Sequence, residues 1–317
     1  MPLPSNNKYF ITGGAGFIGS HLADRLIKLG AITVYDNLSS GRLDFIKHLV
    51  ERNNFHLIQG DLLDSEKLRK AIVGHDVVFH LAANPEVRAG IQTTDLDLKE
   101  GPVATWNVLE AMRLNNIKKL IFASSSTVYG DAGTTLVNED YGPLQPISLY
   151  GAAKLASEAL ISAFCHLFDM QAWCFRLANV VGGRLTHGVI YDFINKLRQT
   201  PGQLEILGDG KQQKPYLHVS DCIEGILFGL EHANEVFNVF NIGPDSSTSV
   251  TTIAGMVVNE MVLKDTKLAF TGGRQGWRGD IPQVRLDVSR IYRLGWQPKH
   301  NSDEAVRQAI NDMIGLA

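Results

Sequence analysis

Apolar and β-branched residues gather in short runs from Lys8 to about Val180, and longer amphipathic segments lie between these runs. Several runs are apolar without a gap, which is typical of strands buried on both faces of a parallel sheet. The strands expected from them are Tyr9–Thr12, Ile32–Tyr35, His56–Ile58, Val77–His80, Leu120–Ala123 and Trp173–Leu177. Helices are expected outside the sheet at Ile18–Leu29, Ala104–Leu114 and Ala152–Phe168. The alternation predicts an α/β fold with a doubly wound parallel sheet.

The pattern changes beyond Val180, where Gly, Pro and isolated aromatic residues are more frequent and the alternation becomes irregular. We therefore predict two domains. Residues 1–180 form the sheet domain, and the strands near 216–243 are left open as a segment that returns to it. Residues 181–317 form a smaller mixed α/β domain that binds the substrate.

The balance of charge excludes some partners. The 317 residues include 30 Lys and Arg against 33 Asp and Glu, so no global positive field is available to hold nucleic acid or an anionic membrane. No apolar run approaches the ~20 residues of a membrane span, and Met1–Asn7 lacks the apolar stretch of a signal peptide. A cytoplasmic location is expected.

Because Cys165, Cys174 and Cys222 have neither metal-ligand spacing nor an even number, we interpret them as packing residues and expect no metal site.

A glycine-rich turn follows the first expected strand directly and opens the first helix. Its spacing is Gly-x-x-Gly-x-x-Gly, from Gly13 through Gly16 to Gly19. The first glycine permits a tight turn, the second lets the backbone approach a pyrophosphate, and the third allows close helix packing. The helix N–H groups, including those of Phe17 and Ile18, would face the anion. A plain turn is the alternative, but the strand–turn–helix context favours a Rossmann-type dinucleotide site.

Asp36 ends the second strand, where a carboxylate can accept hydrogen bonds from both ribose hydroxyls of adenosine. Because it would repel a 2′-phosphate, it favours NAD over NADP. The alternative is that Asp36 only caps the turn that follows it. Asp61, after the third strand, lies where an adenine edge is expected. Further cofactor contacts are assigned to Asn37, Ser40, Gly41 and Leu62.

Tyr150 and Lys154 begin a long helix, and a spacing of four places the phenol and the ammonium on one face. A phenol is a poor base at neutral pH, but an adjacent ammonium and a positively charged nicotinamide both favour the phenolate. The pair is therefore a candidate base, although this spacing also arises by chance. Upstream, a hydroxyl of the run Ser124–Thr127 could share the reacting proton, or the run could simply cap a helix.

Together these pieces resemble the extended short-chain dehydrogenase/reductase family, and within it the nucleotide-sugar epimerases of UDP-glucose (UDP-galactose) 4-epimerase type. The resemblance covers nearly the whole chain. The matching segments are Thr12–Ser20, Asp36–Leu38, His80–Ala83, Ser124–Gly130, Tyr150–Lys154, Arg176–Asn179, Tyr216–Val219 and Gly279–Pro282.

The resemblance implies a role for individual residues. Tyr150 would be the acid/base, Lys154 its electrostatic partner and ribose ligand, and Ser125 the hydroxyl hydrogen-bonded to the reacting group. Leu81, Ala82 and Ala83 would contact the cofactor. Asn179 would contact the sugar diphosphate, and Val189–Phe193 and Glu205–Leu207 would hold the base. The substrate contacts expected are Ser125, Asn179, Val189, Leu207, Lys214, Arg274, Arg278 and Asp280.

Four departures from the family pattern bear on specificity. Lys99–Val103 replaces an asparagine pair near the nicotinamide ribose, Lys214 replaces a phosphate-binding arginine, and Trp277 stands at another arginine position, with Arg274 and Arg278 close by. A lysine offers a point charge without the fork that grips two oxygens. Val284 replaces a bulky gatekeeper, so we hypothesise that UDP-GlcNAc and UDP-GalNAc are accepted as well as UDP-glucose and UDP-galactose.

Other activities remain open. The family's dehydratases carry an Asp-Glu pair where this chain has Ser126 and Thr127, and its glucuronate decarboxylases use glutamate at Thr127. Both are disfavoured, whereas C4 epimerisation of UDP-glucuronate is not. Asp36 opposes an NADP-dependent reductase. A non-catalytic NAD-binding module is the alternative from another class. Helices Ala104–Leu114 and Ala152–Phe168 resemble those that pair in homodimers of the family, although their apolar faces could equally be core.

Overall fold

The computed structural model describes residues 7–315, so the expectation for Met1–Asn7 falls almost wholly outside the described residues. The described chain forms two compact units, each assembled from separate stretches of sequence. Unit 1 comprises the chain up to Ser125 together with Leu149–Arg176 and Ile226–Phe240. Unit 2 comprises Ser126–Ser148, Leu177–Gly225 and the chain from Asn241 onward.

A sheet forms the centre of unit 1, and within residues 7–315 it has seven strands in the order β11-β6-β5-β4-β1-β2-β3. Strand β1 pairs in parallel with β2 on one side and with β4 on the other, so the strand order reverses at this point. Ligands of such sheets bind outside the carboxyl ends of the strands at this reversal. The strands are β1 (Lys8–Thr12), β2 (Ala31–Asp36), β3 (Phe55–Gln59), β4 (Val77–His80), β5 (Lys119–Ser125), β6 (Gln171–Leu177) and β11 (Phe237–Ile242). The predicted fold class is confirmed.

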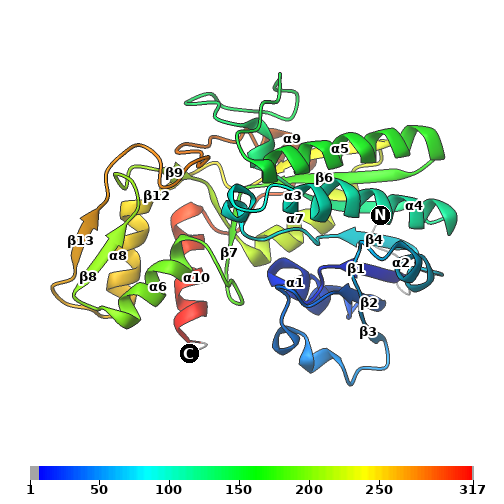
Figure 1. Cartoon of the computed structure of the whole chain (residues 1–317), viewed down its shortest axis with the longest axis horizontal. Helices are drawn as coiled ribbons and strands as arrows, with labels where there is room; N and C mark the ends of the chain where they lie inside the picture. Colours follow the sequence, from blue (N-terminus) through cyan, green and yellow to red (C-terminus); the bar gives the residue numbers. More distant parts are fainter. Residues whose placement is uncertain (1–6, 316–317) are drawn as a thin grey trace. The chain divides into compact units, whose positions relative to one another are not determined.

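Helices cover both faces of this sheet (Figure 1). On one face α2 (Ser65–Ala71), α4 (Ala104–Leu114) and α5 (Leu149–Phe168) pack on strand residues such as Phe10, Val78 and Phe122. On the other face α1 (Phe17–Leu26) packs on β1 and β2. There too, Gly229 of α7 (Val219–His232) lies against the Phe175 ring. Burial on both faces explains why the strand sequences are apolar without alternation.

Two helix starts differ from the expected ones in a way that matters for the site. Helix α5 begins at Leu149 instead of Ala152, so Tyr150 and Lys154 both lie within its first turns. Helix α4 continues from α3 (Leu96–Leu98) through a π-helix, η4 (Lys99–Val103), which contains Pro102. Proline lacks an N–H group, and π-turns inside helices often mark functional sites. The remaining short helices of unit 1 are η1 (Leu43–Phe45), η2 (Lys47–Leu49) and η3 (Val87–Ile91).

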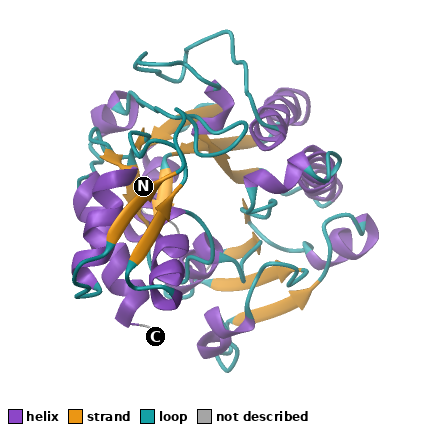
Figure 2. Cartoon of the chain, turned by 60° about the vertical axis from the view of Figure 1, so that its left-hand side comes forward, coloured by secondary structure: helices purple, strands orange, loops and turns teal. Residues whose placement is uncertain are grey.

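Unit 2 is built from short strand pairs and helices, which Figure 2 colours by type. Parallel pairs join β7 (Asn179–Val181) to β10 (Tyr216–His218) and β8 (Gln203–Ile206) to β13 (Lys267–Phe270), and β9 (Gln213–Lys214) pairs antiparallel with β12 (Thr248–Ser249). Figure 1 shows α6 (Val189–Gln199) and α8 (Val250–Glu260) beside the β8–β13 pair. The other helices are η5 (Ser126–Tyr129), α9 (Ser289–Leu294) and α10 (Ser302–Gly315).

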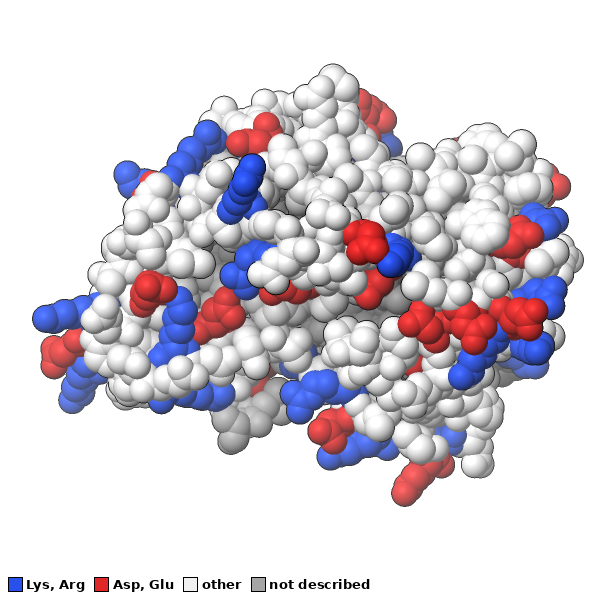
Figure 3. Space-filling view, in the orientation of Figure 1, with Lys and Arg blue, Asp and Glu red and all other residues white. Residues whose placement is uncertain are grey.

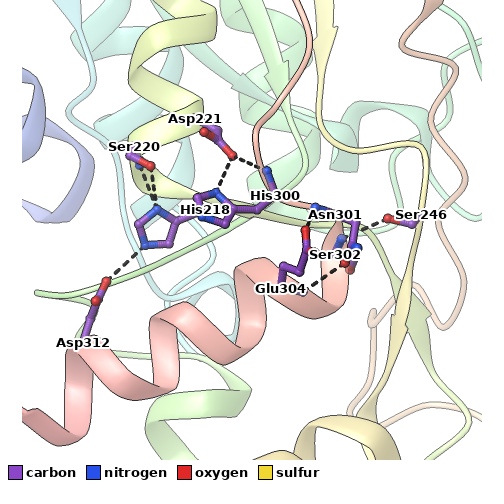
Figure 4. A network of polar contacts seen from close by, with 9 residues as sticks. All are labelled: His218, Ser220, Asp221, Ser246, His300, Asn301, Ser302, Glu304 and Asp312. Carbon is purple, nitrogen blue, oxygen red and sulfur yellow. Dashed lines mark hydrogen bonds and ion pairs between the residues drawn. The ribbon is translucent and has the colours of Figure 1, made fainter.

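A polar network fastens α10 to β10 and α7 within unit 2 (Figure 4). His218 Nε2 lies 3.1 Å from Asp312 Oδ2, and His218 Nδ1 lies 2.7 Å from Ser220 Oγ. His300 Nδ1 lies 2.9 Å from Asp221 Oδ2. The backbone N–H of Ser220 also points to His218 Nδ1, at 3.3 Å. His218, held by Asp312, therefore caps the start of α7. The histidine of the Tyr216–Val219 segment thus has a structural role.

The surface agrees with the balance of charge. On the face seen in Figure 3, basic and acidic side chains are interspersed. Among the helices of residues 7–315, none is long and apolar enough to cross a membrane.

Candidate active site

The glycine-rich turn between β1 and α1 has the backbone that its spacing predicts. Gly13 has φ of +69°, and a Cβ there would lie 2.7 Å from Ala82 N. A Cβ on Gly19 would collide with the carbonyl oxygen of Gly13. Helix α1 starts after Gly16 with no side-chain cap and no acidic residue in its first turn among the described residues. Bare backbone N–H groups at a helix start fit a pyrophosphate, so this turn can hold a dinucleotide.

Asp36 is buried at the end of β2, and both of its oxygens face backbone donors. Oδ2 accepts from Ala15 N at 2.9 Å and Oδ1 from Leu38 N at 2.8 Å. Burial raises the pKa of this carboxyl group, and the two hydrogen bonds counteract the rise. Each carboxylate oxygen has a second acceptor site. Asp36 therefore caps the local turns and still offers acceptors to a ribose, so the two interpretations of this residue are compatible.

The residues expected around adenosine gather at the ends of β2 and β3. Asn37 Nδ2 donates to Asp61 Oδ2 at 3.2 Å, and Leu63 N donates to Asp61 Oδ1 at 2.8 Å. Gly41 lies against Asp36, since a Cβ there would be 2.7 Å from Oδ1. Leu62 is buried, whereas Ser40 is exposed.

The segment after β4 is tied to β1. Leu81 N donates to Thr12 O at 3.2 Å, and Ala82 N points to Thr12 Oγ1 at 3.3 Å. Ala83 follows in the same partly buried stretch. These three residues therefore lie next to the glycine-rich turn, at the reversal of strand order.

The proposed chemical groups stand together in unit 1. Tyr150 in α5 shares a side-chain hydrogen bond with Ser125, the last residue of β5. Lys154, one turn along α5, is buried, donates to Ala123 O at 2.7 Å and lies 5.7 Å from the centre of the Tyr150 ring. The helix face and the carboxyl end of β5 thus present a phenol, a hydroxyl and an ammonium at one place.

The pKa values of Tyr150 and Lys154 are both shifted in the chain alone. Burial and the carboxylate of Asp97 raise the pKa of Tyr150 to about 12, although the Ser125 hydrogen bond lowers it. Burial also lowers the pKa of Lys154 to about 8. In the chain alone desolvation therefore outweighs the ammonium, whose hydrogen bond goes to a backbone carbonyl. The expected phenolate also depends on the positive charge of a bound nicotinamide, so it stays a prediction.

Two acidic residues near this pair were not singled out from the sequence. Glu158 follows Lys154 by one more turn and forms a buried two-pronged ion pair with Arg176. Ser124 Oγ donates to the same carboxylate at 2.5 Å. Glu158 continues the spacing of four from Tyr150 and Lys154, so a sequence signal for it existed. Asp97 had no such signal.

The segment that departs from the family's asparagine pair packs directly on α5. A Cβ on Gly101 would lie 2.8 Å from the Cβ of Ala153. Glycine in the π-helix thus allows close contact next to Lys154. Nearby, His80 joins β4 to Thr12 of β1 at 2.8 Å and to Thr105 of α4 at 3.1 Å. Burial lowers the pKa of His80 to about 3, so this histidine is a neutral structural bridge.

The expected substrate contacts all lie in unit 2 apart from Ser125. Lys214 Nζ forms a partly buried ion pair with Asp280 Oδ1 at 2.6 Å, and Gly276 N donates to Asp280 Oδ2 at 3.2 Å. Gln212 Nε2 donates to the carbonyl of Leu207 at 3.1 Å. Leu207, Lys214 and Asp280 are therefore brought together around the start of β9.

The other expected contacts are more scattered. Asn179 donates through Nδ2 to Pro215 O at 3.3 Å, and Val189 opens α6 after Gly188, whose φ is +89°. The Arg274 guanidinium is exposed, 3.9 Å from Asp131. Arg278 is exposed.

Comparisons with known proteins agree with this arrangement. The model of the NAD dependent epimerase/dehydratase family matches residues 9–243. A UDP-glucose 4-epimerase of Mycolicibacterium smegmatis is 31% identical over 317 residues, which cover 95% of this chain and 96% of the relative. A UDP-N-acetyl-alpha-D-glucosaminuronate decarboxylase of Bacillus cytotoxicus is 35% identical, with 95% of each chain covered. A crystal structure of a UDP-galactose 4-epimerase is 40% identical, with a TM-score of 0.86 over 98% of this chain and 99% of the other.

Proposed function

The chain belongs to the NAD-dependent epimerase/dehydratase family, and from this premise we propose that it inverts C4 of a nucleotide-linked hexose. The first substrates proposed are UDP-glucose and UDP-galactose, with UDP-GlcNAc and UDP-GalNAc as a second pair. One observation carries the proposal: Tyr150 is hydrogen-bonded to Ser125, with Lys154 one helical turn away.

The reaction needs a group that takes the proton from the C4 hydroxyl as hydride leaves C4, and that returns the proton to the same oxygen as hydride comes back to the other face of C4. Tyr150 is that group, and Ser125 holds the phenol oxygen and shares its proton. When bound, oxidised NAD supplies a hydride acceptor for C4 and a positive charge that favours the phenolate. The chain's own acid–base help accounts for roughly 10²–10⁴-fold of the rate.

We propose that the chain keeps its cofactor between turnovers through three groups of residues. The glycine-rich turn with Phe17 and Ile18 holds the pyrophosphate. The cluster of Asp36, Asn37 and Asp61, flanked by Ser40, Gly41 and Leu62, holds adenosine. Leu81–Ala83 and Lys154 hold the nicotinamide ribose.

Unit 2 is proposed to bind the nucleotide of the sugar. Lys214 and Asn179 would contact the diphosphate, and Leu207 and Val189 would hold the base. Because Lys214 is already paired with Asp280, a phosphate would have to share that lysine with a carboxylate. The exposed guanidinium groups of Arg274 and Arg278 supply further positive charge.

The test is incubation of the purified chain with a panel of UDP-sugars without added cofactor, with product stereochemistry read by proton NMR. Inversion at C4 is expected, together with its loss in Tyr150→Phe. Tyr292→Phe is the matched control, since it also removes a phenolic hydroxyl, one on α9 that donates to Gly243 O and has no proposed role in the reaction. Release of carbon dioxide would indicate a decarboxylase, and inversion of UDP-glucuronate a uronate epimerase. Full turnover by Tyr150→Phe would contradict the proposal.

We also propose that the chain forms a homodimer through α4 and α5. Trp106 on α4 is 47% exposed and Leu167 on α5 is 71% exposed, so both helices offer an apolar side chain to a partner. Sedimentation velocity should give a particle of twice the chain mass. Trp106→Glu should shift it toward the monomer, and an unchanged particle would argue for another interface.

A further inference from the structure

Asp97 is a buried carboxylate that the reaction as proposed does not use. It is only 3% exposed, and Oδ1 accepts from Asn84 Nδ2 at 3.0 Å. Oδ2 is buried too, yet it has no hydrogen-bond partner among the described residues. A buried polar oxygen without a donor is costly, so its presence needs an explanation.

The position of this oxygen is fixed by its neighbours. A Cβ on Gly90 would lie 2.5 Å from Asp97 Oδ2 and 3.4 Å from the Cβ of Leu149. Because Leu149 precedes Tyr150 in α5, the carboxylate lies against the start of the helix that carries the acid/base. Asn84 is itself held in place, since Nδ2 donates to Glu86 O at 2.9 Å and Oδ1 accepts from Glu86 N at 3.0 Å.

The charge of Asp97 acts on both members of the pair in α5. It raises the pKa of Tyr150, against the Ser125 hydrogen bond that lowers it. It also raises the pKa of Lys154.

Other groups face Lys154 as well, and they place Asp97 among its neighbours. Glu158 on α5 and Cys174 on β6 raise the pKa of Lys154, and the ammonium lowers the pKa of His80 on β4. Glu158 already pairs with Arg176. Among the described residues Asp97 is therefore the carboxylate facing Lys154 that has no ion-pair partner of its own.

We propose that Asp97 is a further positioning residue of this site, a buried counter-charge that keeps Lys154 cationic and favours the protonated form of Tyr150, the form that returns the proton to the C4 oxygen. The unpartnered oxygen fits this role, because the dipoles of further hydrogen-bond donors would offset part of the carboxylate's electrostatic field at its neighbours. The catalytic meaning of this role rests on the proposed function, whereas the electrostatic role does not.

The first test measures the ionisation of Tyr150 directly by NMR of chain labelled with ¹³Cζ-tyrosine, its signal being assigned by its loss in Tyr150→Phe. With a pKa of about 12, about a tenth of Tyr150 is phenolate at pH 11. Removing one nearby buried charge in Asp97→Asn should move the titration down by about one pH unit, giving about half phenolate at pH 11. Circular dichroism at each pH shows that the chain is folded.

Two further variants sharpen this measurement. Asp97→Leu removes the same charge without adding a buried amide, and it should shift the titration as far as Asp97→Asn. The matched control is Asp95→Asn, which removes an exposed carboxylate two residues away that pairs with Lys99. It should leave Tyr150 unchanged, because water screens an exposed charge. Asp97 variants that do not move the signal, or an equal shift in Asp95→Asn, would overturn the proposal.

The second test is the pH dependence of kcat for the epimerised sugar, whose limbs should move to lower pH in Asp97→Asn while KM changes little. The two proposals can fail separately. If the parent chain turns over no sugar, the proposed function is wrong and the NMR titration still decides the role of Asp97. If the parent is active but neither the titration nor the pH profile of Asp97→Asn moves, the role of Asp97 is wrong and the proposed function stands.

Discussion

Replacing Glu158 by an uncharged residue should lower the free energy of unfolding and also lower the pKa of Lys154. The Glu158 side chain is 5% exposed and that of Arg176 is 6% exposed, with Arg176 Nη2 at 2.7 Å from Oε2 and Nε at 3.0 Å from Oε1. Removing one partner of a buried pair costs about 3–5 kcal/mol, because the other charge stays buried and uncompensated. Since glutamine keeps one acceptor, we expect about 3 kcal/mol for Glu158→Gln, or a fall in Tm of about 4–5 °C.

The second consequence concerns the ammonium one turn earlier. Glu158 raises the pKa of Lys154, which burial already lowers to about 8. Glu158→Gln should therefore bring the pKa of Lys154 closer to neutrality, so that this residue loses its charge within the working pH range. Activity should then fall with rising pH earlier than in the parent chain.

Urea unfolding at pH 7, together with the pH dependence of kcat, measures both effects. The matched control is Glu110→Gln, because Glu110 and Arg113 form a similar two-pronged pair on the surface of α4. Exposed pairs contribute about 0–1 kcal/mol. The double variant Glu158→Leu/Arg176→Met should recover most of the lost stability. If Glu158→Gln unfolds within about 1 kcal/mol of the parent, the uncompensated-charge argument is refuted.

Three further predictions follow from single contacts. His80 is protonated below about pH 6.5 in the unfolded chain but only below about pH 3 in the folded chain. The free energy of unfolding should therefore decrease as the pH falls from 6.5 to 3, by up to ~1.4 kcal/mol per pH unit. Urea unfolding of His80→Asn at pH 7 and pH 4.5 should show a smaller decrease, and a decrease as large as that of the parent would mean that another group causes it. Gly19→Ala should abolish retained NAD, measured by release on denaturation, because its Cβ meets Gly13 O, whereas Gly255→Ala, whose Cβ meets nothing within 4 Å, should keep it. Val284→Tyr should reduce turnover of the acetamido sugars more than tenfold and leave turnover of UDP-glucose and UDP-galactose unchanged. Product NMR on both pairs measures this, and an equal fall for both pairs would contradict the prediction.

The hydrophobic runs located strands of the sheet because a parallel strand covered on both faces must be apolar along its length. The same criterion gives no bounds for β11, which is buried only in part and contains Asn238 and Asn241. The side chains of these asparagines bond backbone carbonyls, with Asn238 Nδ2 at 3.0 Å from Ala172 O. Ala172, Val137 and Asp287, whose carbonyls these asparagines bond, are distant in sequence, so the burial of the asparagines could not be read from the run itself.

The candidate site was predictable where spacing alone decides geometry, as in the glycine-rich turn and the pair Tyr150 and Lys154. Its electrostatics were not predictable, because the pKa of Tyr150 depends on how deeply the phenol is buried and on Asp97. Asp97 lies in a short polar stretch whose sequence gives no sign of burial. Only the folded positions of Gly90 and Asn84 enclose it.

Strand β11 joins the sheet only after the chain has passed through much of unit 2. The sheet therefore lacks its edge strand in any fragment, or any nascent chain, that ends before β11. A fragment that stops at residue 180 would leave the outer edge of β6 open, where Ala172 N otherwise donates to Val236 O at 3.0 Å. Open apolar edges recruit strands from other chains. A nascent chain on the ribosome carries the same open edge until Phe237–Ile242 emerges, so this interval is when the protein is most prone to aggregate.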